Sequence, residues 1–394
     1  MDYLNTRLSF KIKKTLRYVR LYGLGRTLTK VKSQYHMNKE FTTLPEVATP
    51  PRAGGKIGLL GCGNFAFSTI AYYVEARLPG SLRAAMDLRL NQAASLFKEY
   101  KLRYYTDDPS RVIEDPNIDL VFIASNHATH AEYAIDSIGA GKSVHIEKPH
   151  VVSWDQLARL RTAMAENPRS KVFLGFNRPR SKLFRELNTR IATQSGPLMI
   201  NWFIAGHEIA DDHWYFNEEE GGRILGNLCH WSDLILQMVS LDKAFPCVIT
   251  PSTPKDASSD FVVSMVFADR SCATITFSAK GHTFEGVREV LNVHKGNILA
   301  NLTDFQSLTI EEVDRRKTSK LLFRDHGHRE NILHTLECTY DDNCSGENEY
   351  YVAATASFFL TIKDAVECGR PLMLNSDLKV SDARAIPNNA PEVV

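Results

Sequence analysis

A glycine turn between a short apolar run and an apolar helical pattern constrains the fold of this chain most. Residues 57–60 read Ile-Gly-Leu-Leu and are followed by Gly61-Cys62-Gly63-Asn64-Phe65-Ala66. The apolar run predicts a buried strand, and the glycines let backbone N–H groups at the start of the next helix approach an anion. We therefore predict that these six residues belong to the binding site of a dinucleotide cofactor.

The spacing of the turn and the next acid favours one cofactor. Gly61 allows the tight turn, Gly63 lets the backbone approach the pyrophosphate, and Ala66 still permits close helix–strand contact. Asp87 closes the next apolar run, where an acid accepts hydrogen bonds from the adenosine ribose. This favours NAD over NADP, although Arg89 would suit a 2′-phosphate and Asp87 would also serve as a helix cap.

Short apolar runs alternate with helical patterns through the first half of the chain. The runs are 57–60, 82–86, 120–124, 144–146 and 172–176, and helical patterns such as 92–100 and 128–140 lie between them. Parallel strands joined by helices predict a doubly wound α/β sheet. We therefore predict a Rossmann dinucleotide-binding domain over residues 55–178.

The pattern changes after this domain. Helices are predicted at 181–194, 222–239 and 350–367, and strands at 198–204, 261–267, 272–277, 288–292 and 308–311. Consecutive strands with hairpin-like turns predict a second α/β domain with an open, mostly antiparallel sheet. We predict a basic arm and linker over 1–54, this second domain over 179–374, and a tail over 375–394.

Charge is distributed unevenly along the chain. Residues 1–32 carry a formal charge of +8, and the remainder carries −7. Leu8, Ile12, Leu16 and Val19 recur at helical spacing among lysines and arginines, which predicts a basic amphipathic helix. The helix would pack on the acidic body or on a second subunit, make weak contact with a membrane surface, or bind an anionic substrate. The acidic body argues against nucleic acid as a partner.

Composition limits the class of protein. No apolar run approaches the roughly 18 residues that span a bilayer, and the N-terminus lacks the apolar core of a signal peptide. The seven cysteines show no C-x-x-C pair, so free thiols in a reducing, cytoplasmic compartment are expected. No set of cysteines and histidines has the spacing of a zinc site, and we predict no metal.

Two further segments carry a family resemblance. Ser125, Asn126, His127 and His130 follow one predicted strand, and an Ala-Gly-Lys turn leads through the next to Glu147-Lys148-Pro149. Together with the glycine turn, these segments resemble the Gfo/Idh/MocA family of oxidoreductases. The resemblance implies hydride transfer between NAD and a carbinol of a sugar or cyclitol, with these residues near the cofactor. It also implies a second domain whose open sheet mediates homodimers or tetramers.

The Glu-Lys-Pro segment also has a direct physical reading. Pro149 cannot continue a ladder, so the strand stops and Lys148 is presented at its carboxyl end, where ligands bind in open α/β sheets. A lysine there can hydrogen-bond the reacting oxygen and favour a developing alkoxide. The alternative is a surface ion pair. By resemblance Lys148 is catalytic and contacts substrate, and Glu147 lies near the nicotinamide.

A glycine-rich segment enters the predicted helix at 222–239. The family carries an aspartate there and, four residues on, a catalytic histidine, which His230 matches. Gly226 stands at the aspartate position, and the neighbouring Asn227 points about 100° away on an ideal helix. Some branches of the family carry Gly-Gly-Arg-Ile-x-Gly-Glu before Cys-His, and residues 221–230 resemble this segment except at Asn227. Those branches resemble proteins of surface-polysaccharide biosynthesis. Gly226 therefore leaves two interpretations, an acid/base site at His230 or a weakened, repurposed site.

Substrate residues are predicted around both motifs. Asn177, Arg178 and Arg180 follow the last parallel strand, and two arginines there suit a carboxylate or diphosphate. Their alternative is surface charge. Trp214, Tyr215, Arg223 and Asn227 would add stacking and hydrogen bonds to a sugar ring.

These features favour an NAD(H)-dependent oxidoreductase acting on a sugar carbinol. The resemblance points to a nucleotide sugar in polysaccharide or glycan assembly. Two alternatives stay open: a lyase or glycosidase that retains its NAD through transient oxidation, and a non-catalytic protein that binds NAD or sugar.

Overall fold

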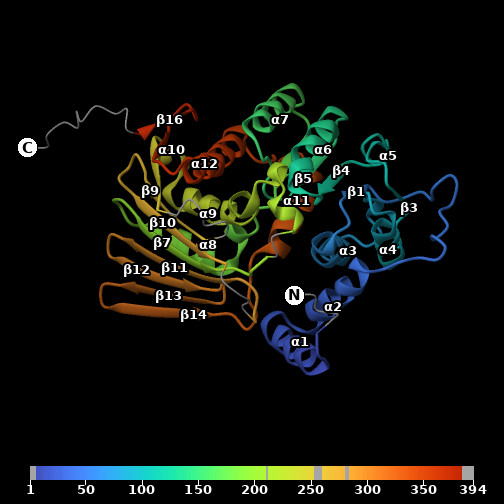
Figure 1. The fold of residues 1–394 in the computed structure, drawn as a ribbon, viewed down its shortest axis with the longest axis horizontal. Helices are drawn as coiled ribbons and strands as arrows, with labels where there is room; N and C mark the ends of the chain where they lie inside the picture. Colours follow the sequence, from blue (N-terminus) through green and yellow to red (C-terminus); the bar gives the residue numbers. More distant parts are fainter. Residues whose placement is uncertain (1–5, 210–211, 253–259, 280–283, 384–394) are drawn as a thin grey trace, which may run out of the picture. The chain divides into compact units, whose positions relative to one another are not determined.

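The computed structural model describes residues 6–209, 212–252, 260–279 and 284–383 (Figure 1). The chain forms two compact units. The Rossmann unit comprises residues 1–181, 218–221 and 322–352, and the sheet unit comprises 182–217, 222–321 and 353–394.

The Rossmann unit is built on a six-stranded parallel sheet of order β3-β2-β1-β4-β5-β6. Its strands are nearly all buried, as expected for a sheet covered on both faces. The sheet confirms the doubly wound prediction and adds β3, which was not predicted because its sequence, Tyr-Tyr-Thr, contains no aliphatic side chain. The strands are β1 (Ile57–Leu60), β2 (Leu82–Met86), β3 (Tyr104–Thr106), β4 (Leu120–Ile123), β5 (Ser143–Ile146) and β6 (Val172–Leu174).

Helices connect these strands. The Ser153 hydroxyl caps α7 by accepting a hydrogen bond from Gln156 N at 3.1 Å. Gly141, with φ of 75°, makes the turn from α6 to β5, and Lys142 Nζ then donates to the Asp115 carbonyl at 2.8 Å. The helices are the π-helical η2 (Ala66–Ile70), α3 (Ala71–Arg77), α4 (Leu90–Tyr100), α5 (Ser110–Ile113), α6 (His127–Gly139) and α7 (Trp154–Glu166).

Two segments outside residues 55–178 complete the Rossmann unit, which differs from the predicted division. The arm folds into α1 (Leu8–Tyr22) and α2 (Leu24–Met37), and both belong to this unit. The later helix α11 (His328–Thr339) also belongs to it, because Ile332, Leu333 and Leu336 are buried in the core formed by β1, β2 and α3. A single domain boundary near residue 178 cannot describe this unit, because a later segment of the chain contributes to the same core.

One expectation about cysteines is wrong. Cys338 and Cys344 form a disulfide that closes the turn after α11, whereas free thiols were predicted for all seven. The turn brings their Cα atoms to 4.9 Å, within the range a disulfide needs, although their sequence spacing matches no common motif. The remaining five cysteines are free.

The sheet unit contains a ten-stranded sheet of order β14-β13-β12-β11-β7-β10-β9-β8-β15-β16. Only the β7–β10 pair is parallel among the paired strands that the structure describes, so the mostly antiparallel prediction is confirmed. The strands are β7 (Met199–Ala205), β8 (Cys247–Pro251), β9 (Phe261–Val266), β10 (Cys272–Ser278), β11 (Arg288–Lys295), β12 (Ile298–Thr303), β13 (Ser307–Glu312), β14 (Arg315–Lys320), β15 (Leu372–Leu374) and β16 (Val380–Asp382). Strand β16 falls within the predicted tail, whose residues 384–394 lie outside the described ranges.

One face of this sheet is covered by helices (Figure 1). Leu187 of α8 (Lys182–Ile191), Leu234 of α9 (Cys229–Val239) and Phe358 of α12 (Glu349–Cys368) share a core with the inward side chains of the strands. The short α10 (Leu241–Ala244) follows α9. The 3₁₀ and π segments are η3 (Arg178–Arg180), η4 (Trp214–Phe216), η5 (Glu218–Glu220) and η6 (Ile224–Leu228).

The opposite face of the sheet carries exposed apolar side chains. Leu299 pairs with His294, His294 with Met199, Met199 with Cys272, and Cys272 with Val266, so these five residues form one cross-strand row. Met199, Val266 and Leu299 are each at least half exposed. Among the described helices, none is long and apolar enough to cross a membrane.

Candidate active site

The predicted cofactor residues gather at one edge of the Rossmann sheet. Because the strands are parallel, the carboxyl ends of β1, β4 and β5 meet there, and the strand order reverses between β1 and β4. Ligands bind at such a switch point in open α/β sheets. The edge carries the glycine turn after β1, Asp87 after β2, Ser125 and Asn126 after β4, and Glu147 to Pro149 after β5.

The glycine turn has the shape that a pyrophosphate requires. Gly61 has φ of 91°, and a Cβ atom there would lie 2.5 Å from the Ala124 carbonyl oxygen, so only glycine fits. At Gly63 a Cβ atom would meet nothing within 4 Å, so the space above this backbone is open. The turn runs into π-helical η2 instead of directly into an α-helix. This open backbone fits the phosphates of a dinucleotide.

Asp87 is hydrogen-bonded to the glycine turn. Its carboxylate accepts hydrogen bonds from Cys62 N at 2.8 Å and from Arg89 N at 2.9 Å. Helix α4 has no side-chain cap, and Arg89 is exposed beside it. A carboxylate held in this way keeps further lone pairs for ribose hydroxyls, and that contact stays a prediction. Burial raises the pKa of the Cys62 thiol well above its usual range.

Two predicted cofactor histidines are buried after β4. His127 Nδ1 lies 3.0 Å from the Glu220 carbonyl oxygen, and His130 lies between the carbonyl oxygens of Pro149, at 2.8 Å, and Ser125, at 3.1 Å. Burial, then the charge of Lys148, lowers the pKa of His127 to about 2. Burial also lowers the pKa of His130. As a neutral imidazole each ring has a single N–H donor, so His127 donates to the Glu220 carbonyl and His130 donates to only one of its two carbonyl neighbours.

Asn126 and Ser125 lie beside these rings. Asn126 is the residue before α6, and Ser125 Oγ accepts a hydrogen bond from Thr129 Oγ1 at 2.7 Å. Glu220 reaches the same point, because its carboxylate accepts from Ala128 N at 3.2 Å. Sequence reasoning missed Glu220, since it lies in an acidic run that carries no recognisable signal.

The Glu-Lys-Pro segment is packed closely against β6. A Cβ atom on Gly175 would lie 2.7 Å from Glu147 Oε2, so this glycine makes room for the buried glutamate. His145 Nε2 lies 3.5 Å from Glu147 Oε1. Lys148 is partly exposed, and its ammonium is near enough to His127 to lower the pKa of that ring. The lysine is thus presented at the edge where the glycine turn opens.

The two predicted arginines after β6 have different surroundings. Arg180 Nε donates to Asn331 Oδ1 at 3.0 Å, and its Nη2 lies 3.5 Å from Glu347 Oε1. Arg178 is buried, and its charge helps to lower the pKa of His328. Asn177 donates through Nδ2 to the His326 carbonyl. Arg180 therefore holds α11 and the segment after it, and contacts of Arg178 and Arg180 with a substrate stay predictions.

In the sheet unit, His230 lies in the first turn of α9 and is 9 % exposed. Asp233, one turn on, is fully buried, and Trp231 Nε1 donates to Glu289 Oε2 at 2.8 Å. The residues just before α9 form the π-helical η6, so the ideal α-helical spacing assumed for residues 226–230 does not hold. π segments of this kind are frequent at functional sites.

Arg223, just before η6, contacts several residues near the start of α9. Its Nη1 donates to Asn227 Oδ1 at 3.2 Å, its Nη2 donates to the His207 carbonyl, and its guanidinium lies 5.7 Å from the Phe277 ring centroid. The side chain is buried, and burial lowers the pKa of Arg223. Two predicted substrate residues, Arg223 and Asn227, are thus joined. Within the described ranges, no three His, Cys, Asp or Glu side chains are grouped so as to hold a metal ion.

A model of a known protein family matches the first domain. Residues 55–176 match a family model described as the GFO_IDH_MocA oxidoreductase family with an NAD-binding Rossmann fold. These residues therefore resemble the NAD-binding domain of that family. The match begins at the strand before the glycine turn and ends after β6.

Several curated proteins resemble the chain. An inositol 2-dehydrogenase of Pseudomonas fluorescens is 31% identical over 150 residues, which are 37% of this chain and 44% of that protein. An inositol 2-dehydrogenase of Ralstonia nicotianae is 26% identical over 208 residues, 52% of this chain and 60% of that protein. The chain thus matches less than half the length of the first of these relatives.

Solved structures resemble both units. GenD2 from gentamicin A biosynthesis, in complex with NAD, has a TM-score of 0.70 at 18% identity and covers 84% of this chain and 99% of its own. Levoglucosan dehydrogenase, in complex with NADH and levoglucosan, has a TM-score of 0.68 at 15% identity and covers 82% and 99%. The fold of the Gfo/Idh/MocA dehydrogenases therefore extends over most of this chain.

The structure gives a physical reason for the departure from the Gfo/Idh/MocA pattern at Gly226. A Cβ atom there would lie 2.5 Å from Tyr215 Cζ and 2.6 Å from its hydroxyl oxygen. The Tyr215 ring thus occupies the space that an aspartate would need, and Trp214 packs edge-on against it with ring centroids 4.9 Å apart. A large aromatic side chain replaces a small acidic one at this point.

Proposed function

We propose that this protein is an NAD(H)-dependent oxidoreductase that acts on a carbinol of a sugar or cyclitol. The observation that carries the proposal is the shared sheet edge: the open backbone at Gly63 and the presented Lys148 follow two strands of one parallel sheet. The Gfo/Idh/MocA match over residues 55–176 supports the choice of cofactor.

NAD, when bound, supplies the hydride acceptor or donor. The residues of the chain do the rest. Lys148 would donate a hydrogen bond from Nζ to the reacting oxygen and favour its alkoxide character. His230 would take the hydroxyl proton at Nε2, because its Nδ1 is buried, and would return it in the reverse direction. Arg223 and Asn227 would hydrogen-bond the hydroxyls of a sugar.

For the substrate we propose a nucleotide sugar, in a branch of the family that serves polysaccharide assembly. The buried Arg178 and the cationic arm support an anionic substrate, since guanidinium groups pair well with diphosphates. The inositol and levoglucosan dehydrogenases among the similar proteins support the sugar or cyclitol part alone.

The proposal is tested by following absorbance at 340 nm with NAD and a panel of myo-inositol, levoglucosan and UDP-, GDP- and dTDP-sugars. Steady NADH formation that is lost in His230→Ala and Lys148→Met, and kept in the exposed control Arg169→Ala, is the expected result. Product without NADH formation would instead indicate an NAD-retaining lyase or glycosidase. Tight NAD binding without any product would indicate a binding protein, an outcome that Gly226 makes worth testing.

We also propose that the open face of the ten-stranded sheet joins two copies of the chain. The row from Leu299 to Val266 is continuous across five strands, and its apolar members are at least half exposed. The next row, with Asn292, Asn201 and Thr274, is polar. Contiguous exposed apolar side chains rimmed by polar ones are typical of a protein interface.

A further inference from the structure

The arm is fixed to the glycine turn by specific polar contacts. His36 Nε2 lies 2.6 Å from the Cys62 carbonyl oxygen, and its ring stacks on Phe67 with centroids 4.3 Å apart. Ser33 Oγ lies 3.2 Å from Asn64 Oδ1. Both Ser33 and His36 are buried, although polar side chains on a surface arm are usually exposed. The second helix of the arm therefore forms part of the wall around the turn.

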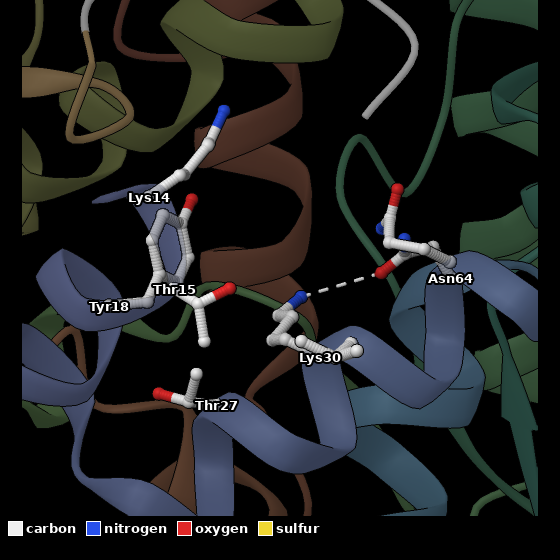
Figure 2. A pocket seen from close by; sticks show the side chains of 8 residues that line it. Lys14, Thr15, Tyr18, Thr27, Lys30 and Asn64 are labelled. Carbon is white, nitrogen blue, oxygen red and sulfur yellow. Dashed lines mark hydrogen bonds between the residues drawn. The ribbon is translucent and has the colours of Figure 1, made fainter. Parts of the chain in front are cut away.

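A cavity of about 250 Å³ lies between α1, α2 and the glycine turn. Figure 2 shows Lys14 and Tyr18 on one side of it, and Lys30 reaching from α2 toward Asn64, with its Nζ 3.5 Å from Asn64 Oδ1. The polar side chains that line it include Lys14, Thr15, Tyr18, Thr27, Lys30 and Asn64, and none of the lining residues is acidic. This lining offers two cations and several hydroxyl and amide donors.

The charges in the cavity lack compensation from its walls. Burial, then the charge of Arg26, lowers the pKa of Lys30 to about 8, and burial lowers the pKa of Lys14. Burial, then Tyr22, raises the pKa of Tyr18 to about 12, so its hydroxyl stays a donor. Placing two ammonium groups in a partly buried pocket is unfavourable unless an anion joins them.

The charges of Arg178 and Lys30 both act on the neutral ring of His328, which lies beside the start of the helix after the turn. His328 stacks edge-on against Phe65, which follows Asn64, with ring centroids 5.5 Å apart. After burial and His326, the charges of Arg178 and Lys30 lower the pKa of His328 well below its usual range. Positive potential thus extends from the arm to the start of the helix after the turn, and this favours an anion there.

We propose that the cavity between α1, α2 and Asn64 binds a diphosphate group, with Lys14 and Lys30 as its cationic partners. Asn64 directly follows Gly63, the open position of the glycine turn. The diphosphate belongs either to the dinucleotide cofactor or to a nucleotide-sugar substrate, so the inference rests on the proposed function. The donors that recognise it are the same in both cases.

The test uses the full chain and measures binding by calorimetry, without turnover. The variants are Lys30→Met on α2 and Lys14→Met on α1. The control is Lys13→Met, an exposed residue next to Lys14 on α1. The probes are inorganic diphosphate, ADP-ribose, UDP and adenosine. We expect about a tenfold loss of diphosphate affinity in each cavity variant, none in Lys13→Met, and no change for adenosine. Lys30→Arg, which keeps the charge, should retain most of the affinity.

The probes distinguish the two sources. A loss for ADP-ribose supports the cofactor as the source, and a loss for UDP with unchanged ADP-ribose supports the substrate. Inorganic diphosphate that fails to bind, or that binds all variants and Lys13→Met equally, would overturn the inference, provided that circular dichroism shows the variants folded. Diphosphate binding here in a protein that oxidises no sugar would contradict the proposed function alone.

Discussion

The Tyr215 hydroxyl donates a hydrogen bond to the Gly226 carbonyl oxygen at 3.0 Å. The same ring lies where a side chain at position 226 would have to be. Tyr215 and Gly226 therefore form one structural unit, and a carboxylate cannot be restored at position 226 without first moving the ring.

Gly226→Asp should destabilise the sheet unit by about 1–3 kcal/mol, because inserting a side chain against a packed ring forces atoms apart. The double variant Tyr215→Ala, Gly226→Asp should recover part of this loss, since it removes the obstructing ring. Tyr215→Phe serves as the control, because it keeps the ring and loses only a hydrogen bond of about 1 kcal/mol. Urea unfolding measures all three. A Gly226→Asp protein as stable as the parent would contradict the packing described here.

Acid should destabilise the Rossmann unit through its buried histidines. Burial lowers the pKa of His150 to about 4, and its Nε2 lies 3.0 Å from the Val352 carbonyl oxygen. An unfolded histidine binds a proton below about pH 6.5, so the unfolded state gains protons first and stability falls as pH drops from 6.5 toward 4. At pH 5 this amounts to about 2 kcal/mol for such a group.

His150→Gln tests this pH dependence, because glutamine keeps an N–H donor and does not titrate. The difference in unfolding free energy between pH 7.5 and pH 5 should shrink by about 2 kcal/mol. The exposed Arg169→Gln should leave the difference unchanged. Equal pH slopes in His150→Gln and the parent protein would show that His150 does not contribute.

Sequence patterns predicted five of the six Rossmann strands because each of these five is an apolar run bounded by polar or glycine residues, as at 57–60 and 120–124. The charged strand Arg315–Lys320 has no such pattern, so it was missed. Backbone pairing to β13 holds it, together with hydrogen bonds from Lys317 and Ser319 to Glu186. Helix α11 was missed because polar side chains such as Asn331 and Thr335 share its buried face. Periodicity shows where apolar surface lies and cannot show which polar side chains find a buried partner.

In the arm, too, the periodicity of apolar residues does not show which side chains are buried. Its apolar stripe predicted the packing face, yet Leu8, Ile12 and Leu16 are exposed, while the polar Thr27, Ser33 and His36 of α2 are buried. Of the site, the glycine turn and Lys148 fall at the predicted sheet edge. The role of Tyr215 beside Gly226 required coordinates, because eleven residues separate them along the chain.

ADP-ribose binding should weaken as pH rises above about 8. Lys30 has its pKa lowered to about 8, and it pairs with an anion only as an ammonium. Lys14 and Tyr18 face it from α1, and Arg26 lies on its own helix. Calorimetry between pH 6.5 and 9.5 should show the decline in the parent protein. Lys30→Arg should bind evenly across this range, because guanidinium stays charged. A parallel decline in both proteins would rule out Lys30 as the titrating group.

The exposed row on the ten-stranded sheet should set the oligomeric state. Met199→Glu places a charge in the middle of this row, next to Cys272 and His294 across the strands. Burying an unpaired charge in an interface is costly, so we expect dissociation to single chains. Light scattering after size exclusion measures the mass, with the exposed Thr193→Glu as the control. A mass unaffected by Met199→Glu would place the interface elsewhere.

The exposed stripe on α1 should give weak binding to anionic bilayers. Leu8, Ile12 and Leu16 are each more than half exposed, and Lys13 and Arg20 lie on the same helix. Apolar side chains flanked by basic ones suit an anionic interface. Sedimentation with phosphatidylserine vesicles should capture the parent protein at low salt and lose it in Leu16→Glu or at high salt. Lys32→Gln, on α2, is the charge control. Equal capture by neutral vesicles would refute the electrostatic part.

The attachment of α2 to the turn has a consequence for how such proteins diverge. His36 contacts Cys62 and Ser33 contacts Asn64, and both side chains come from a segment that precedes the family match, which begins at residue 55. The helix pair α1–α2 thus contacts the glycine turn from outside the residues that match the family model. Selection acting on residues 8–37 can retune that element while every glycine in it stays unchanged.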